Sequence, residues 1–233
     1  MKKTKNLLTK IKDSYIRKPI RNTILLGGLV GLTLFTSIKD NVHFLPAGTM
    51  EINSPQKDQY VWGFFPFTKI TGESDVSITN FSIMGENYIE SNSSTGNVNA
   101  YGLIFGGNTS GDQSFVRNMN SQALIMGSND VKNYSSVGDM KAKSLFFGLN
   151  NVKDNSIVGD MNAGGIIVGD NEVNDNSSVG DMKAKSLLLG LNRVNKGGKT
   201  LINGKITSRG LISHTPKGTS FGTRIENYID YTH

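Results

Sequence analysis

Strand-like alternation of apolar and polar residues recurs along most of this chain. In the segment DMKAKSL, the side chains of Met140 and Ala142 alternate with those of Lys141 and Lys143. A period of two residues is typical of a β-strand, in which successive side chains point to opposite faces. Three apolar residues and a glycine follow (LFFG), and no long run with the helical period occurs in this region. The pattern predicts short β-strands joined by tight turns.

These strand-like segments belong to a repeat of 21 residues. Stepping by this interval reaches a glycine at each of six positions: Gly85, Gly106, Gly127, Gly148, Gly169 and Gly190. Two residues after each glycine stands an asparagine: Asn87, Asn108, Asn129, Asn150, Asn171 and Asn192. A seventh copy aligns when three residues are inserted within Lys196–Lys199, so the repeat covers residues 72–213.

The length of the repeat selects the fold. Repeats of about 20–50 residues build solenoids or propellers, but one propeller blade needs about 40–45 residues. A 21-residue unit fits one coil of a parallel β-helix, and we predict an all-β solenoid of about seven coils. Neighbouring coils would stack about 4.8 Å apart, giving a rod about 30 Å long. This architecture resembles parallel β-helices in general, and the resemblance implies no particular activity.

The repeat columns predict where each side chain lies in a coil. Met140 and Ala142, with their equivalents, are expected to point into the tube, where a flexible thioether fills irregular space. The asparagine column is expected to form a ladder of amides hydrogen-bonded from coil to coil, with ligand contacts as the alternative role. A second set of glycines is expected to take the positive φ angle of a tight turn: Gly96, Gly138, Gly159, Gly180 and Gly204.

Charged residues form two kinds of column. The lysine columns, such as that of Lys141, alternate with neutral residues, because like charges opposite each other destabilise a sheet. In contrast, Asp139, Asp160 and Asp181 occupy consecutive repeats and are followed by Lys205. We interpret them as turn aspartates that accept backbone N–H groups. The alternative hypothesis is a weak calcium-binding stripe, although the double glycine of calcium-binding β-helix repeats is missing.

An apolar column is expected on the outside of the solenoid. Leu145, Phe146 and Phe147, with their equivalents, precede each repeat glycine. If strand alternation continues from Ala142, Phe146 points inward and its two neighbours point outward; a bulge would reverse this. A bare strip over five coils would exceed what a monomer normally exposes. It is either buried by other residues or a corner, or it serves self-association, or it binds another partner.

The N-terminal part carries a basic tail and an apolar run. Residues 23–38 contain no charge, and the basic residues before them predict that residues 1–22 stay in the cytoplasm while the rest crosses the membrane. We therefore expect an uncleaved transmembrane signal-anchor and contact with lipid through residues 1–38. A cleaved signal peptide and a buried core helix are the alternatives.

Charge location argues against nucleic-acid binding. Residues 1–40 hold nine basic and two acidic residues, a net charge of +7, whereas the rest holds 16 basic and 17 acidic residues, a net charge of −1. A nucleic-acid-binding domain carries its basic surface on the folded part. The chain also contains no cysteine, which excludes disulfides and thiolate metal sites.

Both ends of the solenoid are expected to be capped, because exposed strand edges recruit other chains. Residues 39–71 would serve as a linker and N-terminal cap, with Phe64, Phe65 and Phe67 plugging the tube. Residues 214–233 would cap the other end.

No catalytic motif stands out in the sequence. We expect a non-enzymatic, single-pass membrane protein that displays a β-solenoid outside as a structural, adhesive or assembly element. No cofactor is expected apart from the hypothetical calcium. One alternative is a bactofilin-like polymerising scaffold tethered to the membrane from the cytoplasm. Another is a carbohydrate-active β-helix enzyme, which would need a groove of converging acids.

Overall fold

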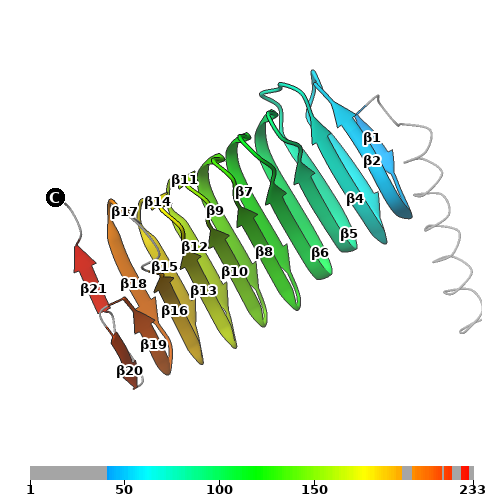
Figure 1. Cartoon of the computed structure of the whole chain (residues 1–233). Coiled ribbons are helices and arrows are strands. Elements are labelled where there is room, and N and C mark those ends of the chain that lie inside the picture. The colour runs from blue at the N-terminus through cyan, green and yellow to red at the C-terminus, as the bar shows by residue number, and fades with distance from the viewer. Residues whose placement is uncertain (1–40, 196–200, 217, 222–226, 231–233) are drawn as a thin grey trace, which may run out of the picture. The chain divides into compact units, whose positions relative to one another are not determined.

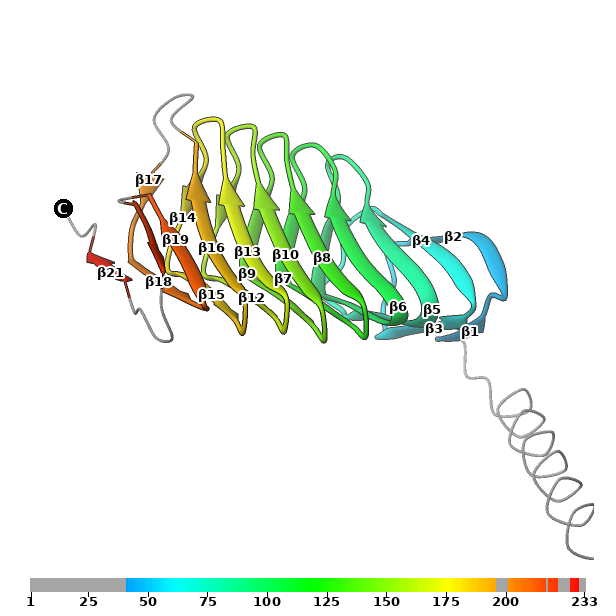
Figure 2. The same cartoon turned by 90° about the horizontal axis from the view of Figure 1, so that it is seen from below.

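A computed structural model describes residues 41–195, 201–216, 218–221 and 227–230, and for residues 218–221 and 227–230 it describes the backbone alone. The described chain is a parallel β-solenoid of about eight turns, and no helix occurs within it. Figures 1 and 2 show the coils stacked one after another from residue 41 toward the C-terminal strands. The predicted all-β repeat fold is therefore confirmed. The expected transmembrane helix at 23–38 lies outside the described residues.

Each coil has three faces, which we name from the coil around residue 140. The short face is Ser136–Val137, the first long face is Met140–Ser144 and the second long face is Phe147–Val152. Neighbouring coils pair in parallel, and Met140 lies beside Met119 and Met161.

The strands are grouped here by face. On the first long face lie β1 (Val42–Phe44), β3 (Gln59–Gly63), β12 (Met161–Gly165), β15 (Met182–Ser186) and β18 (Lys205–Arg209). On the second long face lie β2 (Ala47–Asn53), β4 (Phe65–Thr71), β8 (Met126–Val131), β10 (Phe147–Val152), β13 (Val168–Val173), β16 (Leu189–Val194) and β19 (Ile212–Thr215). The short face holds β11 (Ile157–Val158), β14 (Ser178–Val179) and β17 (Leu201–Ile202). Four longer strands bend from one face to the next: β5 (Ile78–Ile89), β6 (Ser94–Ser110), β7 (Phe115–Ala123) and β9 (Ser136–Ser144).

The interior of the tube is a stack of apolar columns. Met119, Met140, Met161 and Met182 are at most 1% exposed, and Ile206 continues their column into the coil after the predicted insertion. Each such buried methionine stabilises the fold by about 1.5–3 kcal/mol. The inward orientation predicted for Met140 and Ala142 is confirmed.

The solenoid begins earlier than the predicted start at residue 72. β1 pairs with β3, β2 pairs with β4, and β3 and β4 both pair with β5, all in parallel. The prediction of an aromatic plug was wrong, because Phe64 and Phe65 are 52% and 55% exposed and Phe67 is only half-buried and stacks on Tyr88. Smaller residues fill the tube there, among them Val61 and Ile70. These branched side chains match the narrow interior better than a phenyl ring does.

The prediction of positive-φ glycines was also wrong. Among the described glycines only Gly48 and Gly72 have positive φ. The left-handed turn residues are instead mostly Asn and Asp, as at Asp154 and Asn155, whose short polar side chains tolerate this conformation. Gly159 is needed for a different reason: a Cβ atom there would lie 2.6 Å from the carbonyl oxygen of Gly138 in the preceding coil.

The C-terminal end of the stack is closed by two reversed strands. β20 (Gly218–Phe221) pairs antiparallel with β19, and β21 (Asn227–Asp230) pairs antiparallel with β18. The reversal ends the parallel ladder, so both long faces finish at a strand that does not repeat the 21-residue pattern.

Candidate functional surfaces

The asparagine column forms the predicted amide ladder inside the tube. The Nδ2 atom of each asparagine donates to Oδ1 of the next at 2.8–2.9 Å, without interruption from Asn87 to Asn192. All six side chains are buried, and the last one, Asn192, donates to the backbone carbonyl of Thr207. The amide groups of this column therefore hydrogen-bond to one another, which fits a structural role and leaves few of their donors and acceptors for a ligand.

The aspartate column forms a second ladder, on the outside. Asp139 Oδ1 accepts the backbone N–H of Asp160, and Asp160 Oδ1 accepts that of Asp181, at 3.0 and 2.9 Å. Asp181 accepts the backbone N–H of Lys205 at 2.7 Å. One carboxylate oxygen of each of these aspartates therefore accepts a backbone N–H group, as predicted.

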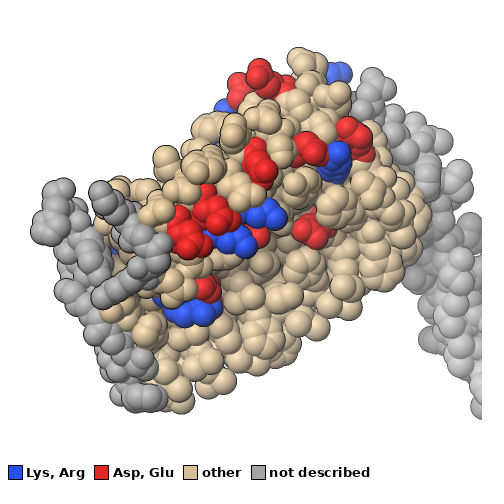
Figure 3. Space-filling model, viewed as in Figure 1, with Lys and Arg blue, Asp and Glu red and all other residues tan. Residues whose placement is uncertain are grey.

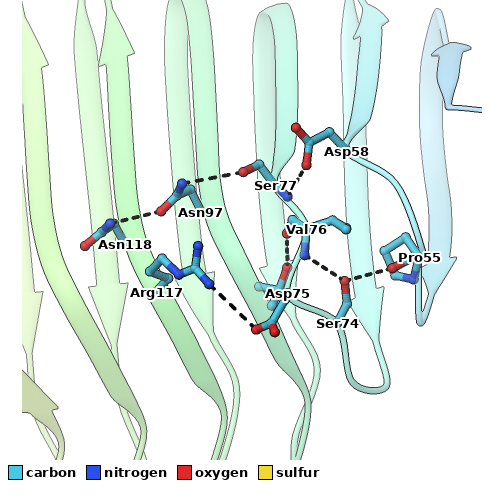
Figure 4. A network of polar contacts seen from close by, with 10 residues as sticks. Pro55, Asp58, Ser74, Asp75, Val76, Ser77, Asn97, Arg117 and Asn118 are labelled. Atoms are coloured by element: carbon cyan, nitrogen blue, oxygen red, sulfur yellow. Dashed lines mark hydrogen bonds and ion pairs between the residues drawn. The ribbon is translucent and has the colours of Figure 1, made fainter.

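The same ladder continues toward the N-terminus through neutral side chains as far as Ser77, where it meets Asp58 (Figure 4). Asn118 Oδ1 accepts the backbone N–H of Asp139, and Asn118 Nδ2 donates to Asn97 Oδ1. Asn97 donates to the hydroxyl of Ser77 at 3.5 Å, and the backbone N–H of Ser77 donates to Asp58. Within the described residues, no group of three acidic, histidine or cysteine side chains is arranged to hold a metal ion. The calcium hypothesis for Asp139, Asp160 and Asp181 stays a prediction.

The corner between the two long faces carries the predicted apolar column. The first residue of each apolar triplet is 41–68% exposed in six successive coils. We call these residues the corner strip: Leu103, Leu124, Leu145, Ile166, Leu187 and Leu211. Backbone hydrogen bonds link each of them to the next. The chain turns at this corner, so Leu145 points outward while Phe146 and Phe147 are half-buried.

A column of outward aromatic rings marks the first coils. Phe44, Trp62, Phe81 and Tyr101 are register partners on the first long face. The ring centroids of Trp62 and Phe81 lie 4.5 Å apart, and those of Phe81 and Tyr101 lie 5.1 Å apart, both stacked. Beside them runs an open apolar groove of about 470 Å³, bounded on the other side by Phe64, Ile83 and Leu103. Sequence reasoning missed this aromatic column, although aromatic–glycine pairs at Trp62 and Tyr101 were a visible signal.

A cluster of charges on the second long face was also missed. The guanidinium of Arg193 contacts both carboxylate oxygens of Asp170 and lies 2.8 Å from Glu172. Burial raises the pKa of Asp170, against the opposing effect of Arg193, because Leu149 and Leu191 flank the carboxylate in the neighbouring coils. Together with Ser128 and Asp130 these residues line a pocket of about 340 Å³. Since Arg193 holds Asp170 through both oxygens, the arrangement is that of a structural ion pair.

Acidic and basic side chains are interspersed on the face seen in Figure 3, and a broad area of that face carries neither. The part of the chain that the structure describes contains no helix able to cross a membrane. Comparison with protein-family models, with curated proteins and with solved structures gave no match.

Proposed function

We propose that this protein is a non-catalytic, membrane-anchored β-solenoid that assembles side by side with its own copies on the outer side of the membrane. The observation that carries the proposal is the corner strip. It joins exposed apolar side chains in register over six coils, at 41–68% exposure. Soluble monomers rarely leave such a continuous apolar surface in water.

The geometry of the strip suits a second copy of this chain. Its members recur once per coil, so the strip is about 24 Å long at the ordinary strand spacing of about 4.8 Å. A second copy presents the same spacing, and a two-fold arrangement would bring strip against strip from Leu124 onward, while Leu103 stays at the edge of the apolar groove of the first coils. Burying these side chains would contribute about 25 cal/mol for each Å² of apolar area removed from water.

The polar groups of the coils support a structural role. The internal amides bond to one another, the outer aspartates hold backbone N–H groups, and Asp170 is held by Arg193. These side chains stabilise the stack. A membrane anchor at residues 23–38 would fix many such rods at one surface, where a high local concentration favours lateral contacts.

Cysteine cross-linking tests the lateral contact. The chain has no cysteine, so Leu145→Cys introduces the only thiol. In membranes from cells producing the full chain, mild oxidation should convert this variant to a covalent dimer. The matched control is Ile157→Cys, which is also apolar and 58% exposed but lies on the short face. No dimer from Leu145→Cys, or equal dimer from both variants, would overturn the assembly proposal.

Membrane sidedness needs a separate test, because a bactofilin-like scaffold tethered from the cytoplasm could use the same strip. A peptide tag placed after His233 should be removed by protease added to intact cells. A tag that survives until the membrane is broken would favour the cytoplasmic scaffold.

A further inference from the structure

We infer that the apolar groove of the first coils lies in the interfacial layer of a lipid bilayer, with the aromatic column facing the lipid. We call this surface the aromatic groove: Phe44, Trp62, Gly63, Phe64, Phe81, Ser82, Ile83, Tyr101, Gly102 and Leu103. The inference rests on the proposed membrane anchor and adds how the folded part meets the membrane.

The composition of the aromatic groove fits lipid. None of its lining residues is charged, and most of its surface is apolar. Trp62 is 48% exposed, and the exposure of Phe44 and Phe64 is similar. Tryptophan and tyrosine are enriched where bilayer meets water, because their rings are apolar and each carries one polar group. Tyr101 shows this character, since its hydroxyl accepts a hydrogen bond from Asn120.

The stacking of the rings argues against a sugar as the occupant. A sugar ring binds by lying flat on an exposed aromatic face. Here Phe81 has its two faces covered by Trp62 and Tyr101, at centroid distances of 4.5 and 5.1 Å. Phe81 therefore presents its ring edge, which acyl chains and the apolar parts of headgroups can contact from any direction.

Chain length places this surface near the membrane. The apolar run ends at Ile38, and β1 begins at Val42. Four residues span at most about 14 Å when fully extended. Phe44, the first ring of the column, follows only two residues later, so the aromatic groove lies within a short distance of the point where the anchor would leave the bilayer.

The apolar character of the column ends as the coils move away from this point. The register partners after Tyr101 are Gln122, Lys143, Gly164, Lys185 and Arg209. The aromatic part covers the first coils over about 14 Å at the usual strand spacing. Interfacial segments bury their apolar faces by about 5–10 Å. A contact of this depth would therefore use the aromatic residues and leave the cationic ones in water.

The only tryptophan of the chain reports directly on this contact. The full chain would be reconstituted into vesicles of phosphatidylcholine and phosphatidylglycerol, prepared with and without bromine on the acyl chains near the headgroup. Bromine quenches tryptophan on contact. Because Trp62 is 48% exposed, bromine can reach its ring, and we expect its fluorescence to be lower in the brominated vesicles than in the unbrominated ones.

A relocated tryptophan provides the control. In the double variant Trp62→Phe, Ile157→Trp, the single tryptophan sits on the short face five coils further along, away from the corner strip, where the native isoleucine is 58% exposed. That position is about 24 Å away along the stack, and we expect no quenching there. Circular dichroism would check that the variant keeps its β structure, and the main measurement needs no variant at all.

The outcomes separate this inference from the membrane anchor. Quenching of Trp62 but not of the relocated tryptophan, in chains that float with the vesicles, supports the inference. Flotation without quenching of Trp62 overturns it and leaves the anchor intact. A dependence of Trp62 emission on protein density rather than on bromine also overturns it, in favour of a second copy. Failure to float removes the anchor and the inference together.

Discussion

The first coils and the later coils share an interior and differ on the outside. The amide ladder begins at Asn87, in the coil of Phe81, and continues into the later coils as far as Asn192, and both parts pair in parallel register. The outward column of the first long face is aromatic from Phe44 to Tyr101, alternates lysine with a neutral residue from Lys143 to Lys185, and ends with Arg209 directly beside Lys185. The interior therefore specifies the fold, while the outer columns vary between coils without changing it.

The two outer columns also follow different spacing rules. Aromatic rings attract each other when stacked, so they occupy consecutive coils at 4.5–5.1 Å between centroids. Ammonium groups repel, so Lys143 and Lys185 are separated by Gly164. The pKa of Lys143 is lowered, chiefly by the positive charge of Lys141 in the same strand and then by burial. Lys185, two coils away, has a smaller effect.

The largest effect is expected from breaking the shared interior. Asn150→Leu removes one acceptor and one donor from the ladder and leaves the amide of Asn129 and the oxygen of Asn171 without partners in the tube. An unsatisfied buried group costs about 1–3 kcal/mol, so we expect a loss of about 4 kcal/mol in the free energy of unfolding. Urea denaturation of the full chain in detergent would measure it.

The same substitution at Asn108 sharpens the comparison, because Asn108 occupies the equivalent place in the aromatic half. We expect a similar loss at both positions. The control is Asn151→Ala, which removes an outer hydrogen bond to Asp130 and should cost no more than about 1 kcal/mol. A much smaller loss at Asn108 than at Asn150 would show that the two halves do not depend equally on the ladder.

The interior was predictable from sequence because its columns recur at a constant step. The glycine and asparagine columns hold the 21-residue interval over six copies. The aromatic column does not: its register partners are 18, 19 and 20 residues apart before the interval reaches 21. Turn lengths change in these coils, and a scan at fixed period does not follow them. The ion pair of Asp170 and Arg193 was not predicted for a related reason. Its two residues are 23 positions apart in the sequence, so the pair runs diagonally between coils and does not follow the 21-residue interval.

An intermediate effect is expected from filling the gap in the lysine column. Gly164→Lys would place three lysines in consecutive coils, and like charges directly opposite each other are destabilising. The site has room, because a Cβ atom at Gly164 meets nothing closer than 3.7 Å. Relative to Gly164→Ala, we expect Gly164→Lys to lose about 1 kcal/mol at low ionic strength. Thermal unfolding at rising salt should recover most of this loss, because salt screens exposed charges; a difference independent of salt would count against charge repulsion.

The smallest effect is expected from the buried ion pair of the later coils. Replacing Asp170 by leucine would match its neighbours Leu149 and Leu191. The side chain of Arg193 is 43% exposed and keeps Glu172 as a partner, so the substitution leaves no buried charge unpaired. We expect a change of at most about 1 kcal/mol at neutral pH.

The pH dependence of that change has a defined sign. The pKa of Asp170 is raised in the folded state, so the folded chain binds more protons than the unfolded chain between the ordinary and the raised value. Wild-type stability should fall as the pH rises through this window, and Asp170→Leu should lack that slope. Arg193 and Glu172 face the same carboxylate and His214 also acts on it, so urea midpoints of both proteins must be compared across the same pH series. Parallel curves would contradict the raised pKa.

Because the register between coils is constant, the length of the solenoid is set by the number of its coils. Each 21-residue unit from Gly106 to Gly190 pairs with its neighbours in the same register, so a whole unit could be duplicated or deleted without changing that register. Every unit gained or lost would change the length by about 4.8 Å. If the chain is anchored at one end, the number of coils sets how far the C-terminal strands stand from the membrane, and that distance can evolve in fixed steps while the fold stays the same.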